Sequence, residues 1–372
     1  MQNVNSMIDN YEKNNNLSSN QEDTDDEFER LLNEFVNGNT DPDEDTDNDE
    51  EEFDDEDDID TDADTPAPTT DQSEIEQNQG VSVKVEILLP INNPREELDR
   101  LVGCADIKRR IDELIALTNY NRIMHELFPN SKQHRVSLHS LFLGRPGTGK
   151  TTVCKIFGSL LHQAGALSKG HVVVCDRGTF IGTLWGDEER AMRQIVDRAR
   201  GGVLMIDEAY LFNGKNDNDP GKIVIQLLMN LLADESQRDI AVVLCGYKEP
   251  MQKMLATNPG LQSRFPNKFE FSDFTIDELL EITRRRLKEY DYQFTASAWQ
   301  KYSQMLTQAY QLRDPETWGN ARFIANQLER IYIRHAARCV QHFPKRKSDL
   351  LKLTPDDIAP IDIPRPRTKI GF

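Results

Sequence analysis

Apolar and polar residues follow two different periods along the middle of this 372-residue chain. Residues 96–127 repeat apolar side chains at the three- and four-residue spacing of a helix. Beyond them, short and nearly continuous apolar runs alternate with helical segments. The runs are residues 137–144, 171–176, 203–207, 240–246 and 268–271. Such runs are typical of a parallel sheet covered on both faces, so the pattern predicts a doubly wound α/β domain with five parallel strands over residues 96–272.

The strand pattern then stops, and only helical periodicity continues. Thr275 and Glu278 have the spacing of a capping box, which predicts that a helix begins there. Further helical patterns cover residues 295–311 and 319–341. We therefore expect a small helical domain over residues 273–345 and a C-terminal tail over residues 346–372.

Charge separates the first 80 residues from the rest. Residues 1–80 hold 29 of the 64 acidic residues and two of the 44 basic ones, so the net charge is −27 there and +7 over the remainder. With so few apolar side chains, this segment cannot offset the entropy lost on folding, and it is expected to be a disordered acidic tail. Apolar residues within 28–36 have the spacing of a short amphipathic helix. The tail is therefore either simply solvated, or docks on a partner or on a basic surface of its own body.

Residues 81–95 are interpreted as a linker. The apolar run at 81–90 predicts either a short strand packed on the body or the end of that linker. We find no apolar N-terminal leader, no run of about 18 apolar residues and no CxxC pair of cysteines. These features favour a cytoplasmic protein with no membrane segment.

A phosphate-binding motif follows the first predicted strand directly. The sequence GRPGTGKT at 144–151 fits GxxxxGK[ST] and opens a predicted helix. Its glycines allow the backbone to wrap a phosphate, and its N–H groups face the anion. The ammonium group of Lys150 would reach the β- and γ-phosphates of ATP, and the hydroxyl of Thr151 would ligate Mg²⁺. The expected nucleotide-binding residues are Gly144, Arg145, Pro146, Gly147, Thr148, Gly149, Lys150, Thr151 and Thr152.

Two adjacent carboxylates complete the predicted site. Asp207 and Glu208 follow the apolar strand GGVLMI, at the edge where open α/β sheets bind ligands. We expect Asp207 to hold the Mg²⁺ shell and Glu208 to orient and polarise the attacking water. Tandem acids after a strand also serve as helix caps, but their pairing with a phosphate loop favours ATP hydrolysis.

Five motifs in this order resemble AAA+ proteins of the CbxX/CfqX group over about residues 96–345: GRPGTGKTT, GGVLMIDEAY, LCGY, NPGLQSRF and GNAR. The resemblance implies a hexameric ring with ATP at subunit interfaces, and an AAA+ domain followed by a helical lid domain. It implies that Arg264 is an arginine finger for the neighbouring subunit and that Arg322 is the sensor-2 arginine of the lid. Val102 and Gly103 match the adenine-contacting segment, although Val102 could equally serve core packing.

Two positions depart from the pattern of the group. The fourth strand ends in Gly246-Tyr247 where many AAA+ proteins have Thr-Asn, so Tyr247 is only a candidate sensor of the γ-phosphate. The segment of the central-pore loop carries Leu184 and Trp185, with the aromatic ring one position later than the tyrosine of the group. These two side chains either grip a threaded chain or pack into the core.

The motifs thus predict a Mg²⁺-dependent ATPase, and the resemblance implies that it remodels a protein client as a homo-hexamer. The alternative is a nucleotide-dependent assembly switch that recruits partners through the acidic tail without threading. That tail would repel nucleic acid, and Arg284–Arg286 is interpreted as a solvated helix face. His335, Cys339 and His342 share a helical face but lack a fourth ligand, so we interpret them as structural.

Overall fold

The computed structural model describes residues 83–130, 137–181, 187–214, 216, 218–233 and 239–360. Among these, residues 83–338 and 351–360 form one compact unit. Residues 339–350 fall outside it and are described by themselves: they hold the end of one helix, α13, and most of a 3-10 turn, η3 (Lys347–Leu351).

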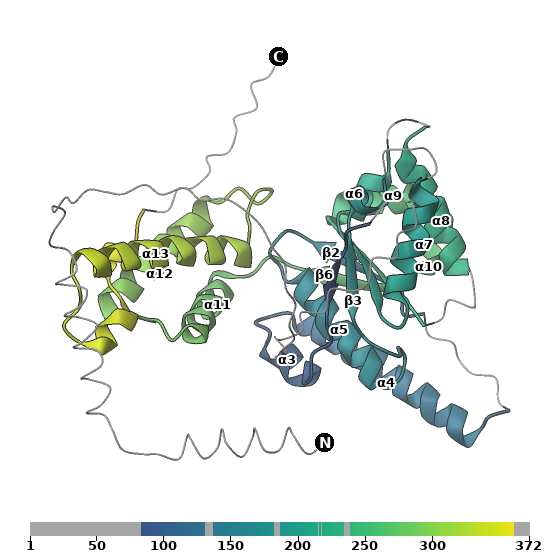
Figure 1. The fold of residues 1–372 in the computed structure, drawn as a ribbon, viewed down its shortest axis with the longest axis horizontal. Coiled ribbons are helices and arrows are strands. Elements are labelled where there is room, and N and C mark those ends of the chain that lie inside the picture. The colour runs from purple at the N-terminus through teal and green to yellow at the C-terminus, as the bar shows by residue number, and fades with distance from the viewer. Residues whose placement is uncertain are drawn as a thin grey trace, which may run out of the picture. The chain divides into compact units, whose positions relative to one another are not determined.

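A six-stranded sheet forms the centre of the first domain, with the order β1-β3-β4-β5-β2-β6 (Figure 1). The strands are β1 (Glu86–Leu88), β2 (Ser140–Gly144), β3 (Val172–Cys175), β4 (Val203–Ile206), β5 (Ala241–Gly246) and β6 (Asn267–Phe271). The five strands from β2 to β6 are parallel, which confirms the predicted sheet. The run at 81–90 contributes β1, which pairs antiparallel with β3 at the edge.

Helices cover both faces of this sheet (Figure 1). One face carries α3 (Pro94–Arg100), α4 (Ala105–Leu127) and α5 (Lys150–Gln163). The other carries α6 (Arg177–Phe180), α7 (Asp187–Ala199), η1 (Ala209–Phe212), α8 (Pro220–Ala233), α9 (Lys248–Thr257) and α10 (Pro259–Arg264).

Alternation along each strand fills two separate cores. In β2, Leu141 and Leu143 pack on the α7 side, whereas Phe142 packs on the α5 side. All three side chains are at most 4% exposed. Because each buried side chain of this size stabilises the fold by about 1.5–3 kcal/mol, this strand is anchored from both faces.

The second domain is a helical lid. It contains α11 (Ile276–Glu289), β7 (Gln293–Phe294), α12 (Ala296–Leu312), α13 (Ala321–Gln341), β8 (Lys352–Leu353) and the turn η4 (Pro355–Asp357). The predicted capping box opens α11: Glu278 N donates to Thr275 Oγ1 at 3.3 Å, and Thr275 N donates to Glu278 Oε2 at 2.8 Å. Both bonds satisfy N–H groups that the first helical turn leaves free.

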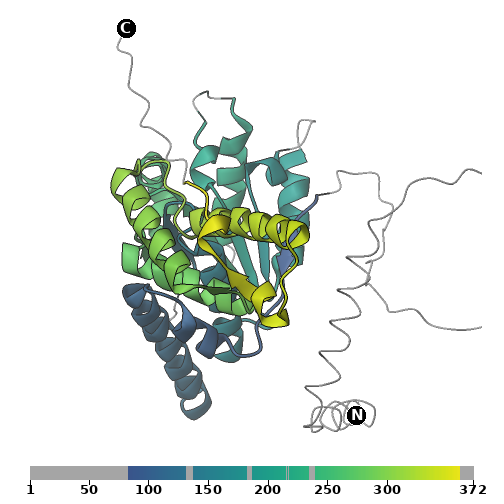
Figure 2. The ribbon, with the colours of Figure 1, turned by 90° about the vertical axis from the view of Figure 1, so that its left-hand side faces the viewer.

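The lid continues past residue 345, where the sequence pattern ended it. Leu353 and Ile358 are buried in the lid core, and β8 pairs in parallel with β7, although the pattern predicted no strand after residue 274. Figure 2 shows the end of the described chain, in yellow, beside the lid helices. Two-residue strands are too short to produce a period, which is why the pattern missed them.

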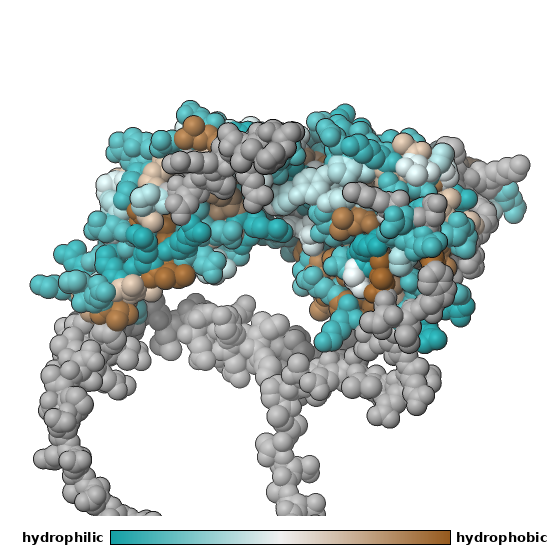
Figure 3. Space-filling view, turned by 90° about the horizontal axis from the view of Figure 1, so that it is seen from above, coloured by the Kyte–Doolittle hydropathy of each residue, from teal (hydrophilic) through white to brown (hydrophobic). Residues whose placement is uncertain are grey.

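The face seen in Figure 3 is mostly hydrophilic, with small separate apolar patches. Among the described residues no helix is both long enough and apolar enough to cross a membrane.

Candidate nucleotide-binding site

The carboxyl edge of the sheet brings the predicted site together. The phosphate loop, residues 144–149, leads from β2 into α5, and Asp207 follows β4 directly. Strand β5 lies between β2 and β4, with Leu143 opposite Gly246 and Ile206 opposite Leu244. Three strands therefore end side by side where ligands bind in open parallel sheets.

Backbone conformation shapes the phosphate loop. Gly147 and Gly149 have φ values of 72° and 93°, which side chains with a Cβ rarely adopt. The ammonium group of Lys150 donates to the carbonyl oxygens of Gly144 and Arg145, each at 2.9 Å. Burial lowers the pKa of Lys150, and the nearby carboxylates Asp207 and Glu208 oppose that effect. A positive side chain and a helix start thus face the same loop, which fits a phosphate group.

The two carboxylates have distinct surroundings. Asp207 Oδ1 accepts the backbone N–H of Glu208 at 3.0 Å, and Glu208 itself has a left-handed φ of 50°. Burial and the charge of Asp207 raise the pKa of Glu208, while Lys150 lowers it. The carboxylate of Glu208 also accepts a hydrogen bond from the hydroxyl of Tyr210, which the sequence motifs did not single out. Tyr210 in turn packs edge-on against Tyr247, with ring centroids 5.8 Å apart.

An adjacent pocket of about 230 Å³ lies between the phosphate loop and the lid. Val102, predicted to contact adenine, lines it together with Leu101 and Thr152. Gly103 has a structural role instead. Its φ is 65°, and a Cβ at this position would lie 2.2 Å from a carboxylate oxygen of Glu278. The pocket is a mixed apolar and basic cleft of a size that suits a nucleotide base.

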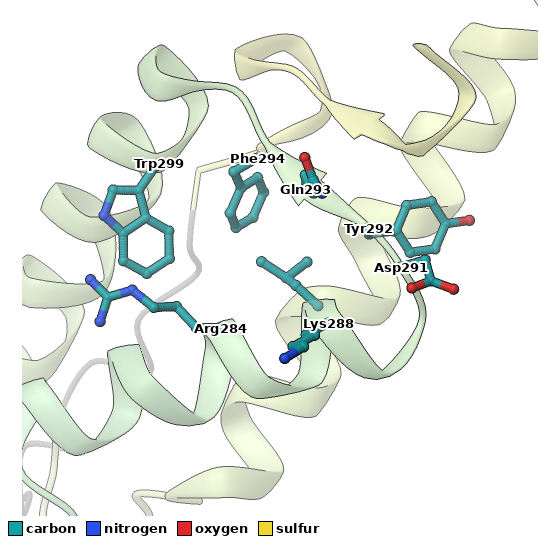
Figure 4. Close-up of a pocket in the computed structure, with 8 residues that line it drawn as sticks. Arg284, Lys288, Asp291, Tyr292, Gln293, Phe294 and Trp299 are labelled. Atoms are coloured by element: carbon teal, nitrogen blue, oxygen red, sulfur yellow. The ribbon is translucent and has the colours of Figure 1, made fainter. Parts of the chain in front are cut away.

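The basic run at 284–286 divides between two sites. Arg285 and Arg286 border the pocket beside the phosphate loop, while their side chains remain 49% and 51% exposed, as predicted for a solvated helix face. Arg284 faces a second pocket of about 510 Å³ within the lid, where its guanidinium lies 4.5 Å from the centre of the Trp299 ring (Figure 4). No residue predicted to bind nucleotide lines that second pocket.

The two predicted catalytic arginines lie in different surroundings. Arg322, at the start of α13, is close enough to Lys150 for its charge to lower the pKa of that ammonium group. Arg264 instead donates to the carbonyl oxygen of Leu232, near the end of α8, at 2.8 Å. Burial lowers the pKa of His139 to about 4, and the charge of Arg264 adds to that effect.

The remaining predicted residues lie in the first turn of α5 or outside the described residues. Thr151 is exposed in the first turn of α5, whereas Leu184 and Trp185 lie outside the described residues. Within the described ranges, no group of three or more His, Cys, Asp or Glu side chains could hold a metal ion. His335 Nδ1 lies 2.9 Å from a guanidinium nitrogen of Arg338.

Four side chains are joined between the phosphate loop and the lid by contacts that the motifs did not predict. Arg145 donates to Asp273 Oδ2 at 2.7 Å and to Glu316 Oε1 at 2.9 Å, so its side chain faces the lid. Asn320 donates to the other oxygen of Asp273 at 2.9 Å. Arg145 lies in the phosphate motif and Asn320 in GNAR, but neither motif indicates a contact with Asp273, which is 128 positions from Arg145 and 47 from Asn320.

Comparison with known proteins agrees with this geometry. Residues 140–273 match the family model described as ATPase family associated with various cellular activities (AAA), and residues 275–367 match the AAA lid domain. Stage V sporulation protein K of Bacillus subtilis strain 168 is 34% identical over 264 residues, covering 71% of this chain and 81% of that protein.

Two further relatives match a similar share of this chain. A CfxQ homolog of Trieres chinensis is 36% identical over 282 residues, covering 74% of this chain and 92% of that protein. The chloroplastic ribulose bisphosphate carboxylase/oxygenase activase of Cyanidioschyzon merolae is 36% identical over 268 residues, covering 71% of this chain and 89% of the relative.

Proposed function

Because this chain belongs to the AAA+ ATPases of the CbxX/CfxQ group, we propose that it hydrolyses ATP with Mg²⁺ and remodels a protein client as a homo-hexameric ring. The observation that carries the proposal is the meeting of Lys150, Asp207 and Glu208 at one edge of the sheet, beside a loop whose backbone suits a phosphate.

Each residue of the site has a part in this proposal. The loop N–H groups and Lys150 bind the phosphates, and Thr151 with Asp207 holds the magnesium ion. Bound MgATP supplies the phosphoanhydride bond that is broken. Glu208 orients a water molecule and accepts its proton, because its carboxylate lies beside Lys150 and has a raised pKa. Arg322 contacts the γ-phosphate from the lid, and Val102 packs against the base.

Separate observations support the proposed ring and the proposed protein client. Arg264 is held by the carbonyl oxygen of Leu232 rather than at the phosphate loop of its own chain, which agrees with a role toward a neighbouring subunit. A relative with 36% identity is named as an activase of another enzyme, which supports action on a protein client. Leu184 and Trp185 would then contact that client in the pore.

The decisive experiment compares Glu208→Gln with wild type in ATP and Mg²⁺. The variant should bind ATP with unchanged affinity in calorimetry, lose hydrolysis, and retain a client in pull-down. Lys150→Ala should lose binding itself, and chelation of Mg²⁺ should stop wild-type turnover. Unchanged hydrolysis by Glu208→Gln would exclude the proposed role of this carboxylate.

The acidic segment supports a second candidate. Residues 1–80 carry a net charge of −27, which suits recruitment of a basic partner by a nucleotide-dependent switch without threading. Trp185→Ala separates the two functions: it should abolish remodelling and spare ATP hydrolysis if the client is threaded. If the protein instead acts as a switch without threading, Trp185→Ala should spare both of these activities. Deletion of residues 1–80 should then abolish partner binding.

A further inference from the structure

We propose that Asn320 is a positioning residue for Arg322, and that Asp273 and Arg145 extend it into a clamp between the phosphate loop and the lid. The clamp comprises Arg145, Asp273, Glu316 and Asn320. This inference rests on the proposed function, because it assigns the clamp to nucleotide binding and hydrolysis at the same loop.

Asn320 is built into the junction between the two domains. Its side chain is fully buried, and its backbone has a φ of 50°, a conformation that asparagine tolerates better than most residues. The amide oxygen accepts the backbone N–H of Phe274 at 3.1 Å, and the amide nitrogen donates to Asp273 Oδ1 at 2.9 Å. The same nitrogen lies 3.4 Å from the carbonyl oxygen of Pro146 in the phosphate loop. One side chain thus contacts the loop, the interdomain segment and the lid.

Asp273 connects this amide to a cation of the phosphate loop. Its Oδ1 accepts from Asn320 and its Oδ2 accepts from Arg145 at 2.7 Å, so both carboxylate oxygens are used. The carboxylate is 18% exposed and the Arg145 side chain 31%. A charge-assisted bond with this little solvent access is stronger than an exposed pair. Glu316, at 80% exposed, adds an outer contact to the same guanidinium.

The backbone of the lid turn meets the phosphate loop directly. Ala321 N donates to the carbonyl oxygen of Gly147 at 3.1 Å, and a Cβ on Gly147 would lie 2.0 Å from the carbonyl oxygen of Gly319. Arg322 follows in the same turn, and its N–H donates to Gly319 at 3.0 Å. The position of this turn therefore determines the backbone position from which the Arg322 side chain extends.

These contacts predict a specific effect of losing the Asn320 side chain. The turn that bears Arg322 is held on the loop by one backbone bond and by the Asn320 side chain, and the loop is where phosphate binds. Loss of the amide should let the turn shift, and a shift of about 1 Å at a reacting group can lower a rate about 100-fold. The clamp also links the loop to the whole lid, because Asn320 lies at the start of α13.

Asn320→Gly is the direct test, since glycine accepts the left-handed φ while removing the amide. Asp291→Gly is the matched control: Asp291 also lies in the lid with a positive φ, 57°, but forms no part of the clamp. We expect Asn320→Gly to lower kcat about 10- to 100-fold and to reduce the preference for ATP over ADP in calorimetry. Asp291→Gly should change neither by more than about twofold. An equal kcat and an equal preference for ATP over ADP in the two variants would overturn the proposed clamp.

A double-mutant cycle with Arg322→Ala separates positioning from general loss of structure. If Asn320 acts through Arg322, then Asn320→Gly should change kcat by less than about threefold once Arg322 is already alanine. Full additivity of the two effects would refute the positioning role. Asp273→Asn serves as a second variant should Asn320→Gly unfold, and it should show the same dependence on Arg322.

The results would differ if the proposed ATPase function, and not the clamp, were wrong. A wild-type protein that binds ATP without hydrolysing it would contradict the proposed ATPase. In that case a reduced ATP-over-ADP preference in Asn320→Gly would still support the clamp. An unchanged preference would contradict it.

Discussion

Tyr210→Phe probes the hydrogen bond that the structure places on the proposed catalytic base. The substitution keeps the ring that packs edge-on against Tyr247 and removes only the hydroxyl that donates to Glu208. Glu208 must be ionised to accept a proton from water. A donor favours the charged carboxylate, so its loss should raise the pKa of Glu208 further above its ordinary value.

The size of this effect follows from the chemistry of the bond. A hydrogen bond to a charged group contributes about 1.5–3 kcal/mol. A change of one pH unit in a pKa corresponds to about 1.4 kcal/mol. The acidic limb of the kcat profile should therefore move upward by about one to two pH units. Well above that limb the carboxylate is ionised in both proteins, so their rates should converge.

The assay is phosphate release at saturating MgATP between pH 5 and 9. Tyr290→Phe is the control, because Tyr290 is an exposed tyrosine of the lid. Calorimetry should show unchanged ATP affinity in Tyr210→Phe, since the hydroxyl is not expected to contact the nucleotide. An acidic limb at the wild-type position, or a downward displacement, would refute the assignment of Tyr210 as a donor to the catalytic carboxylate.

Two substitutions test close packing and one tests the proposed arginine finger. Gly147→Ala should abolish ATP binding in calorimetry, because its Cβ would lie 2.0 Å from the lid backbone at a φ of 72°; near-normal affinity would contradict the close approach. Arg264→Ala should retain ATP affinity and lower kcat by about 10³-fold or more, and a loss below tenfold would exclude an arginine finger. Leu353→Ala should lower the free energy of unfolding by about 2–5 kcal/mol in urea, because Leu353 is fully buried; exposed Leu351→Ala is the control, and equal stabilities would place residue 353 outside the lid core.

Local sequence patterns predicted elements whose chemistry is contained in a few adjacent residues. The phosphate loop is one, because the conformation of Gly149 and the start of α5 depend on neighbours within a few positions. The capping box of Thr275 and Glu278 is another. Strands β2 to β6 could be predicted because burial on both faces produces continuous apolar runs.

Contacts between distant residues had no such signal. Leu353 belongs to the lid core only because β8 returns to pair with β7, about 60 residues away. A short separation did not guarantee a signal either: Tyr210 lies two residues after Glu208, and only the structure, with a left-handed backbone at Glu208, shows that its hydroxyl donates to that carboxylate.

The sequence by itself determined the fold class, the phosphate loop and the two acids after β4, because backbone conformation and burial there are local properties. Only the tertiary structure decided that Arg145 turns away from the loop toward Asp273, and that Asn320 joins the two. A hydrogen bond needs its partners within about 3 Å, and for residues so far apart only the packed chain supplies that proximity.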